Sequence, residues 1–115
     1  MDILIDESVI ENMKEDLGED TCQILIGLFI EETASLFTDL KIAFEAMDLK
    51  AIESATHILK NSAVLYGATS VATKAKEIND RLCLPSKLAT STDYQLLELI
   101  QTTLQAYNNK YYKDI

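Results

Sequence analysis

Apolar residues recur every three or four positions along most of the chain, a spacing that places them on one face of an α-helix. The longest such series is Ile24, Leu25, Leu28, Phe29, Leu36, Leu40, Phe44 and Met47. Two later series are Val71, Ala75, Ile78 and Leu82, and then Leu96, Leu97, Ile100, Leu104 and Tyr107. No segment alternates apolar and polar residues with a period of two, so the pattern predicts an all-α protein.

Capping residues set the predicted bounds of the first two helices. Asp6-Glu7-Ser8 places a capping residue and an acid at the start of a short helix. That helix runs to about Leu17 and is ended by Gly18. Asp20 or Thr21 is predicted to cap the second, much longer helix.

The next two helices are separated by a glycine. Asp48 is predicted to cap a third helix, Leu49 to Tyr66, which Gly67 stops. Thr69 or Ser70 then starts a fourth helix. The second and third helices are predicted to form a long hairpin.

The single proline marks the last break in the pattern. Leu84-Pro85-Ser86 ends the fourth helix, and a loop follows to Ser91. A last helix runs from about Thr92 to Tyr107, and the tail from Asn108 to Ile115 is predicted to fray. We therefore predict an antiparallel up-down four-helix bundle with a short extra N-terminal helix across one end.

Composition narrows the class of protein. The 115 residues, 48% of them apolar, suit one domain with its own core, here spanning residues 1–115. The formal net charge of −9 argues against nucleic acid and against anionic membrane surfaces, although it serves solubility equally well. The longest apolar stretch, Ile24 to Ile30, is too short to span a bilayer.

The cysteines and the N-terminus indicate a cytoplasmic protein. Cys22 and Cys83 form no C-x-x-C pair and are predicted to be reduced thiols at opposite ends of the bundle. No basic segment precedes an apolar one at the N-terminus, so no signal peptide is predicted. Met1 at the start of a full domain suggests a free-standing protein.

His57 is the chain's one histidine, and helical geometry assigns its face. A helix turns about 100° per residue. Measured from His57, the positions about 160–220° away on the third helix are Ile52, Ala55, Leu59 and Tyr66. These apolar residues form the core stripe, so the histidine is predicted to face solvent.

The neighbours of His57 on the same face are mostly polar: Lys50, Glu53, Ser54, Lys60, Asn61 and Val64. Lys60 and Asn61 are its i+3 and i+4 partners and stand beside the imidazole. A cation in that place would attract a phosphoryl group carried on the ring. A single exposed histidine on a helix is nevertheless more often an inert surface residue.

Other chemistries find little support in the residues. Glu53 and His57 share a face, but two ligands do not make a metal site, so none is predicted. No Gly-x-Ser-x-Gly turn or Cys–His arrangement suggests triad catalysis. No glycine loop for binding the phosphates of ATP is present.

The segment His57-Ile58-Leu59-Lys60-Asn61-Ser62-Ala63, followed by Leu65-Tyr66-Gly67-Ala68, resembles the signature of histidine-containing phosphotransfer (HPt) domains. That signature reads His-x-Leu-Lys-Gly-Ser, with Gly-Ala ten and eleven residues after the histidine. The likeness covers the whole chain. It includes Gly18-Glu19-Asp20, Leu28-Phe29-Ile30, Leu40 and Ala55-Thr56-His57.

The resemblance implies roles for individual residues. His57 would accept the phosphoryl group and Lys60 would support it electrostatically. Asn79, where the family often has glutamine, would orient the imidazole from the next helix, although an asparagine there could equally be an ordinary solvated residue. The partner would contact Lys50, Glu53, Ser54, Asn61 and Val64, while Leu59, Ser62 and Gly67 would belong to the structural part of the motif.

The resemblance also implies partners and cofactors. The protein would carry phosphoryl groups between the receiver domains of a hybrid histidine kinase and of a response regulator. It would be a monomeric carrier, not an enzyme, and would bind no ATP and no cofactor of its own. Magnesium would be supplied by the receiver.

Asn61 departs from the family, which has glycine at this position. The larger side chain could crowd the receiver, restrict the choice of partner, or donate a hydrogen bond to the phosphoryl group. It also favours an alternative, in which an HPt-shaped module docks on a receiver or kinase and regulates it without chemistry. A third interpretation is an unrelated helical bundle in which the motif arises by chance.

Overall fold

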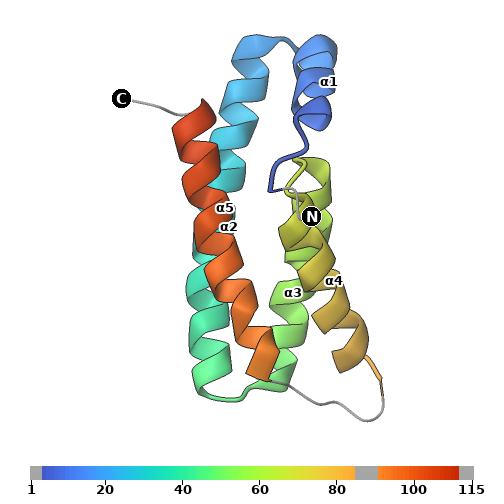
Figure 1. Ribbon diagram of the computed structural model, residues 1–115, viewed down its shortest axis with the longest axis vertical. Coiled ribbons are helices and arrows are strands. Elements are labelled where there is room, and N and C mark those ends of the chain that lie inside the picture. Colours follow the sequence, from blue (N-terminus) through green and yellow to red (C-terminus); the bar gives the residue numbers. More distant parts are fainter. Residues whose placement is uncertain (1–3, 85–90, 112–115) are drawn as a thin grey trace.

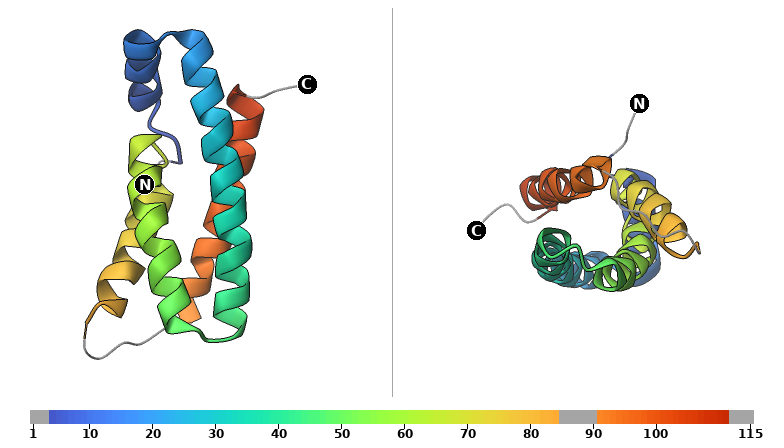
Figure 2. Two further views of the ribbon diagram at one scale, coloured as in Figure 1. Left: turned by 180° about the vertical axis from the view of Figure 1, so that it is seen from behind. Right: turned by 90° about the horizontal axis from the view of Figure 1, so that it is seen from below.

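The computed structural model describes residues 4–84 and 91–111, which form five α-helices and one 3-10 turn. The elements are α1 (Glu7–Leu17), α2 (Glu19–Glu45), α3 (Leu49–Leu65), α4 (Thr69–Leu82), η1 (Ser91–Tyr94) and α5 (Gln95–Tyr111). The four longer helices run alternately down and up and close into a ring, which is seen end-on in Figure 2. The short α1 folds back beside the start of α2 and covers the end of the α3–α4 pair (Figure 1). The predicted all-α bundle with an extra N-terminal helix is confirmed.

Gly18 joins α1 to α2 without a linker. The Asp6 carboxylate caps α1 by accepting from the Ser8 N–H at 3.1 Å, as predicted. Gly18, with φ 90° and ψ 156°, reverses the chain within one residue. Its carbonyl accepts the Cys22 N–H, so α2 begins at Glu19. The prediction that Asp20 or Thr21 caps α2 is therefore wrong, because the helix has already started.

The face that α2 turns to the core differs in part from the predicted one. Its buried residues are Cys22, Ile26, Gly27, Phe29, Thr33, Leu36, Leu40, Ala43 and Phe44. Ile24 and Leu28, predicted to be buried, are 63% and 55% exposed. Met47, also predicted to be buried, lies beyond the helix and is exposed. The apolar run from Ile24 to Ile30 covers every side of the helix, so its periodicity does not identify the buried face.

The predicted bounds of α3 and α4 are close to the observed ones. The Asp48 carboxylate caps α3 by accepting from the Ala51 N–H at 3.1 Å. The helix ends at Leu65, one residue before the predicted end, and α4 begins at Thr69. Its four predicted core residues, Val71, Ala75, Ile78 and Leu82, are all buried.

Gly67 occupies a turn where only glycine fits. Its φ of 81° lies in the left-handed region. Its carbonyl accepts the Asp6 N–H at 2.7 Å, which ties the start of α1 to the α3–α4 turn. A Cβ at this position would lie 2.8 Å from the Asp6 carbonyl oxygen. The structure therefore explains why the motif has glycine at position 67.

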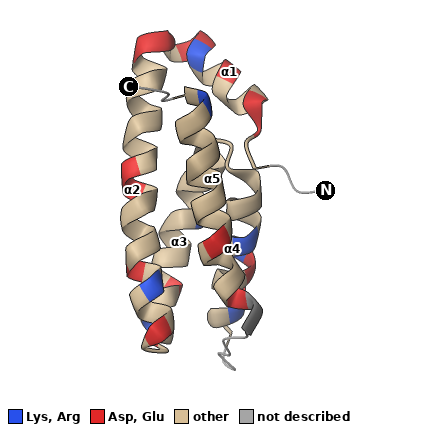
Figure 3. Ribbon diagram, turned by 60° about the vertical axis from the view of Figure 1, so that its left-hand side comes forward, with Lys and Arg blue, Asp and Glu red and all other residues tan. Residues whose placement is uncertain are grey.

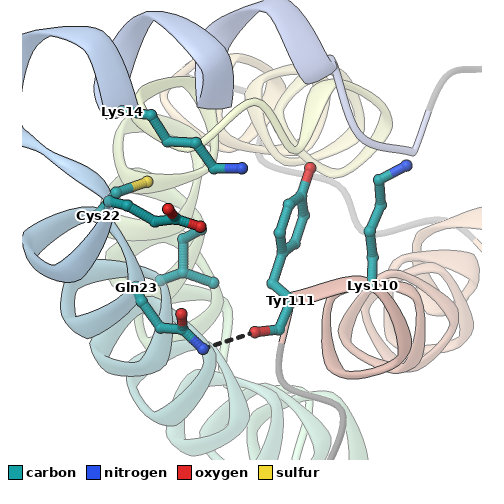
Figure 4. Close-up of a pocket in the computed structure, with 7 residues that line it drawn as sticks. Lys14, Cys22, Gln23, Lys110 and Tyr111 are labelled. Atoms are coloured by element: carbon teal, nitrogen blue, oxygen red, sulfur yellow. Dashed lines mark hydrogen bonds between the residues drawn. The ribbon is translucent and has the colours of Figure 1, made fainter.

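The last helix is longer than predicted. It continues to Tyr111, so the prediction that the tail frays from Asn108 is wrong for the described part of it. The Gln23 side chain donates to the Tyr111 carbonyl at 3.0 Å, and Lys110 pairs with Glu7 at 2.6 Å. Figure 4 shows this junction, where α1, α2 and α5 surround a pocket of about 140 Å³. Residues 112–115 lie outside the described part.

The start of α5 also differs in detail. The predicted first residue, Thr92, falls in η1, and the α-helix itself begins at Gln95. The chain leaves α4 at Leu82, close to the predicted break. The predicted loop around Pro85 lies outside the described residues.

The two cysteines are free, with Cys22 buried and Cys83 exposed. They lie near the start of α2 and just after α4, at opposite ends of the bundle, as predicted (Figure 1). Within residues 4–84 and 91–111, no helix is long and apolar enough to cross a membrane.

Charge is unevenly distributed over the bundle. Residues 4–48 contain twelve acidic and two basic residues, and Figure 3 shows acids gathered on α1 and the start of α2. The α3 and α4 helices instead hold five basic and three acidic residues. The net charge of −9 therefore does not describe the surface around His57.

Candidate functional site

His57 projects into solvent from the middle of α3. The residue is exposed, whereas Ile52 and Leu59 on the opposite side of the helix are fully buried. Ala55 is buried with them, and Tyr66 is half-buried. The assignment of faces from helical geometry is confirmed.

Lys60 lies one turn after His57 and leans toward α4. Its Nζ is 3.0 Å from Asn79 Oδ1 and 4.0 Å from Asp80 Oδ1, and the side chain is only 23% exposed. Asp80 pairs more closely with Lys76, at 2.7 Å. Donation from Lys76, with a smaller contribution from Lys60, lowers the pKa of the Asp80 carboxyl. A cation held by its contacts with α4 therefore lies one turn after His57 on α3.

Asn79 is buried between α3 and α4, with 2% of its surface exposed. Its Oδ1 accepts from Lys60. Its Nδ2 donates to the Glu53 carbonyl at 2.8 Å and to Thr56 Oγ1 at 3.2 Å. The residue is thus not a solvated surface position. Among the described residues, the amide contacts Lys60 instead of the His57 ring, which the resemblance had given as its partner.

Glu53 and Cys83 meet at the edge of this cluster. The Cys83 thiol donates to Glu53 Oε2 at 3.3 Å, which raises the pKa of the thiol together with a smaller effect of burial. A thiol with a raised pKa stays protonated and is a poor nucleophile. Glu53 was predicted to contact a partner, yet it is half-buried and turned toward α4.

The other predicted contact residues remain on the surface. Lys50, Ser54, Asn61 and Val64 are all exposed along α3. Of the motif residues, Leu59 packs in the core and Gly67 forms the turn described above. The Ser62 hydroxyl donates to the Leu59 carbonyl at 3.4 Å, within the same helix.

An apolar groove on the other side of His57 was not predicted. The groove lies between α2 and α3, is open to solvent and has a volume of about 400 Å³. Ile42 and Ile58, which are 60% and 47% exposed, line it. Ser54 also lines it, with Asp39 at its polar edge. The groove was missed because two helices build it, whereas the periodicity of one helix describes only its own faces. Ile58, directly after His57, was the available signal.

The described residues offer no evident metal centre. Within 4–84 and 91–111, no three His, Cys, Asp or Glu side chains are close enough together to hold an ion. The polar side chains around this part of α3 include the Lys60 ammonium, the buried Asn79 amide and the half-buried Glu53 carboxylate. This set suits electrostatic contact with an anion better than coordination of a metal.

Several phosphorelay proteins are similar to this chain. The phosphorelay protein LuxU of Vibrio cholerae is 28% identical over 106 residues, which are 91% of this chain and 94% of that protein. LuxU of Vibrio vulnificus is 28% identical over 105 residues, 90% of this chain and 91% of that protein. Multistep phosphorelay regulator 1 of Schizosaccharomyces pombe is 29% identical over 117 residues, 96% of this chain but 39% of that longer protein. No solved structure matches the chain closely.

The family comparison covers most of the bundle. The Hpt domain family matches residues 24–110, which include all of α3 and α4 and therefore His57, Lys60 and Asn79. The region matched begins in α2 and ends in the last turn of α5, so it covers α3, α4 and most of α2 and α5. The chain belongs to the Hpt domain family, the phosphotransfer domains of two-component signalling.

Proposed function

We propose that this protein carries a phosphoryl group on His57 between receiver domains in a phosphorelay. The observation that supports this most strongly is the setting of the histidine. The exposed His57 is followed on α3 by Ile58, which lines the apolar groove toward α2, and one turn later by Lys60, whose ammonium leans toward α4. One side offers a charge for the phosphoryl group, and the other offers a surface for a partner.

The proposed transfer is a displacement at phosphorus. The lone pair of a neutral ring nitrogen of His57 attacks the phosphorus of a receiver aspartyl phosphate. The new N–P bond forms as the P–O bond to the aspartate breaks, and that bond's electron pair leaves with the carboxylate. Lys60 attracts the phosphoryl oxygens throughout, and phosphoryl transfer depends largely on such positioning and charge stabilisation. Magnesium is expected on the receiver, and the carrier contributes no cofactor.

The α2–α3 groove is the proposed docking surface. Ile42 and Ile58 would be covered by an apolar patch of the receiver, which brings its aspartate to His57. Asp39 and Asp48, which also line the groove, favour a partner with basic residues around that patch. The proposed partners are the receivers of a hybrid histidine kinase and of a response regulator. We propose that the carrier acts as a cytoplasmic monomer.

Substitution of the histidine tests the proposal. Wild-type protein incubated with a phosphorylated receiver should acquire a label that is labile in acid and stable in base. His57→Gln should acquire none, while its melting curve stays close to that of the wild type because the side chain faces solvent. A labelled His57→Gln variant would show that another residue accepts the group.

The second candidate function is a binding module without chemistry, which the exposed Asn61 beside His57 favours. In that case the wild type would bind a receiver but would never become labelled. His57→Gln would then bind as tightly as the wild type and would leave regulation of the receiver unchanged.

A further inference from the structure

We propose that Asn79 is a positioning residue for the transfer: it holds the Lys60 ammonium beside His57 without neutralising its charge. The inference rests on the proposed function, because it concerns the rate of that reaction. It assigns Asn79 a different task from orienting the ring, the one that the resemblance implied.

The partners of Asn79 determine how its amide is oriented. An ammonium can only donate and a backbone carbonyl can only accept. Oδ1 must therefore face Lys60, and Nδ2 must face the Glu53 carbonyl. Turning the amide over would place donor against donor and acceptor against acceptor in a site that is nearly closed to water. The oxygen that binds Lys60 is thus fixed.

The hydrogen bond from Lys60 to Asn79 acts as a neutral tether. It leaves the positive charge of the ammonium available to attract an anion. A carboxylate at the same distance would hold Lys60 but would also cancel much of its charge. The nearest carboxylate, that of Asp80, is 4.0 Å away and is drawn to Lys76 at 2.7 Å. The hydrogen bond to Asn79, at 3.0 Å, is the shorter contact of Lys60. Lys60 is therefore immobilised mainly by a neutral group.

The tether also joins the two turns of α3 that flank the histidine. Glu53 and Thr56 lie in the turn before His57, and Lys60 lies in the turn after it. In an α-helix the Glu53 carbonyl is also the acceptor for the His57 N–H. Asn79 thus ties Lys60 to the backbone that carries the histidine. A free lysine would lose side-chain entropy on ordering, whereas the hydrogen bond to Asn79 orders Lys60 before the phosphoryl group arrives.

A double-mutant cycle separates this role from a purely structural one. Asn79→Ala should lower the rate constant of transfer from a phosphorylated receiver about tenfold in the presence of Lys60. In a Lys60→Met background the same change should alter the rate by less than about twofold, because there is no ammonium to position. Asp80→Asn is the matched control: it removes the carboxylate that lies 4.0 Å from Lys60 and pairs with Lys76, but it leaves the hydrogen bond from Lys60 to Asn79 in place. It should change the rate by less than about twofold.

Each outcome of the double-mutant cycle either supports or contradicts a positioning role for Asn79. An equal loss in both backgrounds would make Asn79 merely structural. No loss from Asn79→Ala, or none from Lys60→Met, would also overturn the inference. Failure of the wild type to accept any label would instead refute the proposed function.

A measurement on the unmodified protein needs neither transfer nor a folded variant. In NMR spectra of the lysine ammonium groups, Lys60 protons should exchange with water several-fold more slowly than those of the exposed Lys41 and Lys50. Equal exchange at all three lysines would show that Asn79 does not hold the ammonium, whatever the cycle gives.

Discussion

Asn61 is exposed one turn after His57, on the side from which a receiver must approach. If its side chain limits that approach, Asn61→Gly should speed transfer and widen the range of receivers accepted. Glycine within a helix should also lower the free energy of unfolding by roughly 0.5–1 kcal/mol. Transfer and stability would then change in opposite directions, which a general loss of folding cannot produce. Transfer rates from several receivers and a melting curve measure both.

A control for this prediction lies on another helix. Gln101→Gly, at an exposed position in α5, should lose similar stability without speeding transfer. Slower transfer in Asn61→Gly would mean that Asn61 binds the phosphoryl group or the receiver. Unchanged rates with every receiver would leave it as an ordinary surface residue.

Tyr107 should make the bundle less stable at alkaline pH. Its hydroxyl donates to the Tyr66 carbonyl at 2.6 Å, and burial raises the pKa of this phenol well above 10. The folded state holds the proton more tightly than the unfolded chain. The resulting stability is therefore fully present below about pH 10 and is lost as the pH rises above it. Burial raises the pKa of Tyr66 and Tyr111 in the same direction.

We expect Tyr107→Phe to be less stable than the wild type at pH 7 by about 1 kcal/mol, because one hydrogen bond is lost. Above pH 10 its stability should fall less steeply than that of the wild type. Denaturant midpoints measured from pH 7 to 11.5 would test this. Parallel curves for the two proteins would rule out Tyr107 as a source of the pH dependence.

The helices α2 and α3 end in the same way but with different residues. In each, the chain turns through a left-handed residue, Met47 or Gly67. The following N–H returns to the last turn of the helix, from Asp48 to Ala43 and from Ala68 to Ala63. This is the Schellman motif, in which glycine is favoured because other residues are strained.

Met47→Gly should therefore raise the free energy of unfolding by about 0.5–1 kcal/mol. Glycine relieves the backbone strain at this position, and this gain exceeds the cost of the greater entropy of glycine in the unfolded chain. Ala46→Gly is the matched control, since Ala46 has φ −87° and gains nothing from glycine. It should destabilise by about 0.5–1 kcal/mol. Chemical denaturation of both variants would give the two signs. A loss in both would show that the Met47 contact with Tyr94 outweighs the strain.

Elements with local signals could be predicted from the sequence, and those that depend on distant contacts could not. The caps Asp6 and Asp48 act within three residues of themselves, so the starts of α1 and α3 were predicted correctly. The end of α5 depends on Gln23, 88 residues from Tyr111 along the chain. The buried face of α2 depends on which neighbours surround it. Neither feature can be predicted from the local sequence of its own helix.

In the candidate site, too, features set by one helix could be predicted, and features set by contacts between helices could not. The exposure of His57 follows from the turn angle of one helix, and it was predicted correctly. The orientation of Asn79 depends on Lys60, 19 residues earlier and on another helix, so only the position of Asn79 could be predicted. The groove needs the packing of α2 on α3, and spacing along either helix does not reveal it.

The whole molecule has an electrostatic asymmetry that should act on partner binding. The α3 and α4 helices carry more basic than acidic residues, whereas α1 and α2 carry most of the acids. A phosphorylated receiver site is anionic, so it is drawn to the α3–α4 side and repelled from the α1 end. Association should slow by roughly two- to fivefold when salt is raised from about 50 to 500 mM. Stopped-flow mixing would measure this, and a rate that rises with salt would contradict it.

Because α1 is attached by few contacts, we expect it to unfold separately from the four-helix ring. Of its residues only Ile10 is buried, and its start is tied to Gly67 by a backbone hydrogen bond. The four-helix ring keeps its own core when α1 detaches, so α1 should open and reclose without global unfolding. Native-state hydrogen exchange should show α1 amides exchanging through an opening that costs less than the one protecting α3. If the two helices exchange with the same free energy and denaturant dependence, the chain unfolds as one unit and α1 is integral to the bundle.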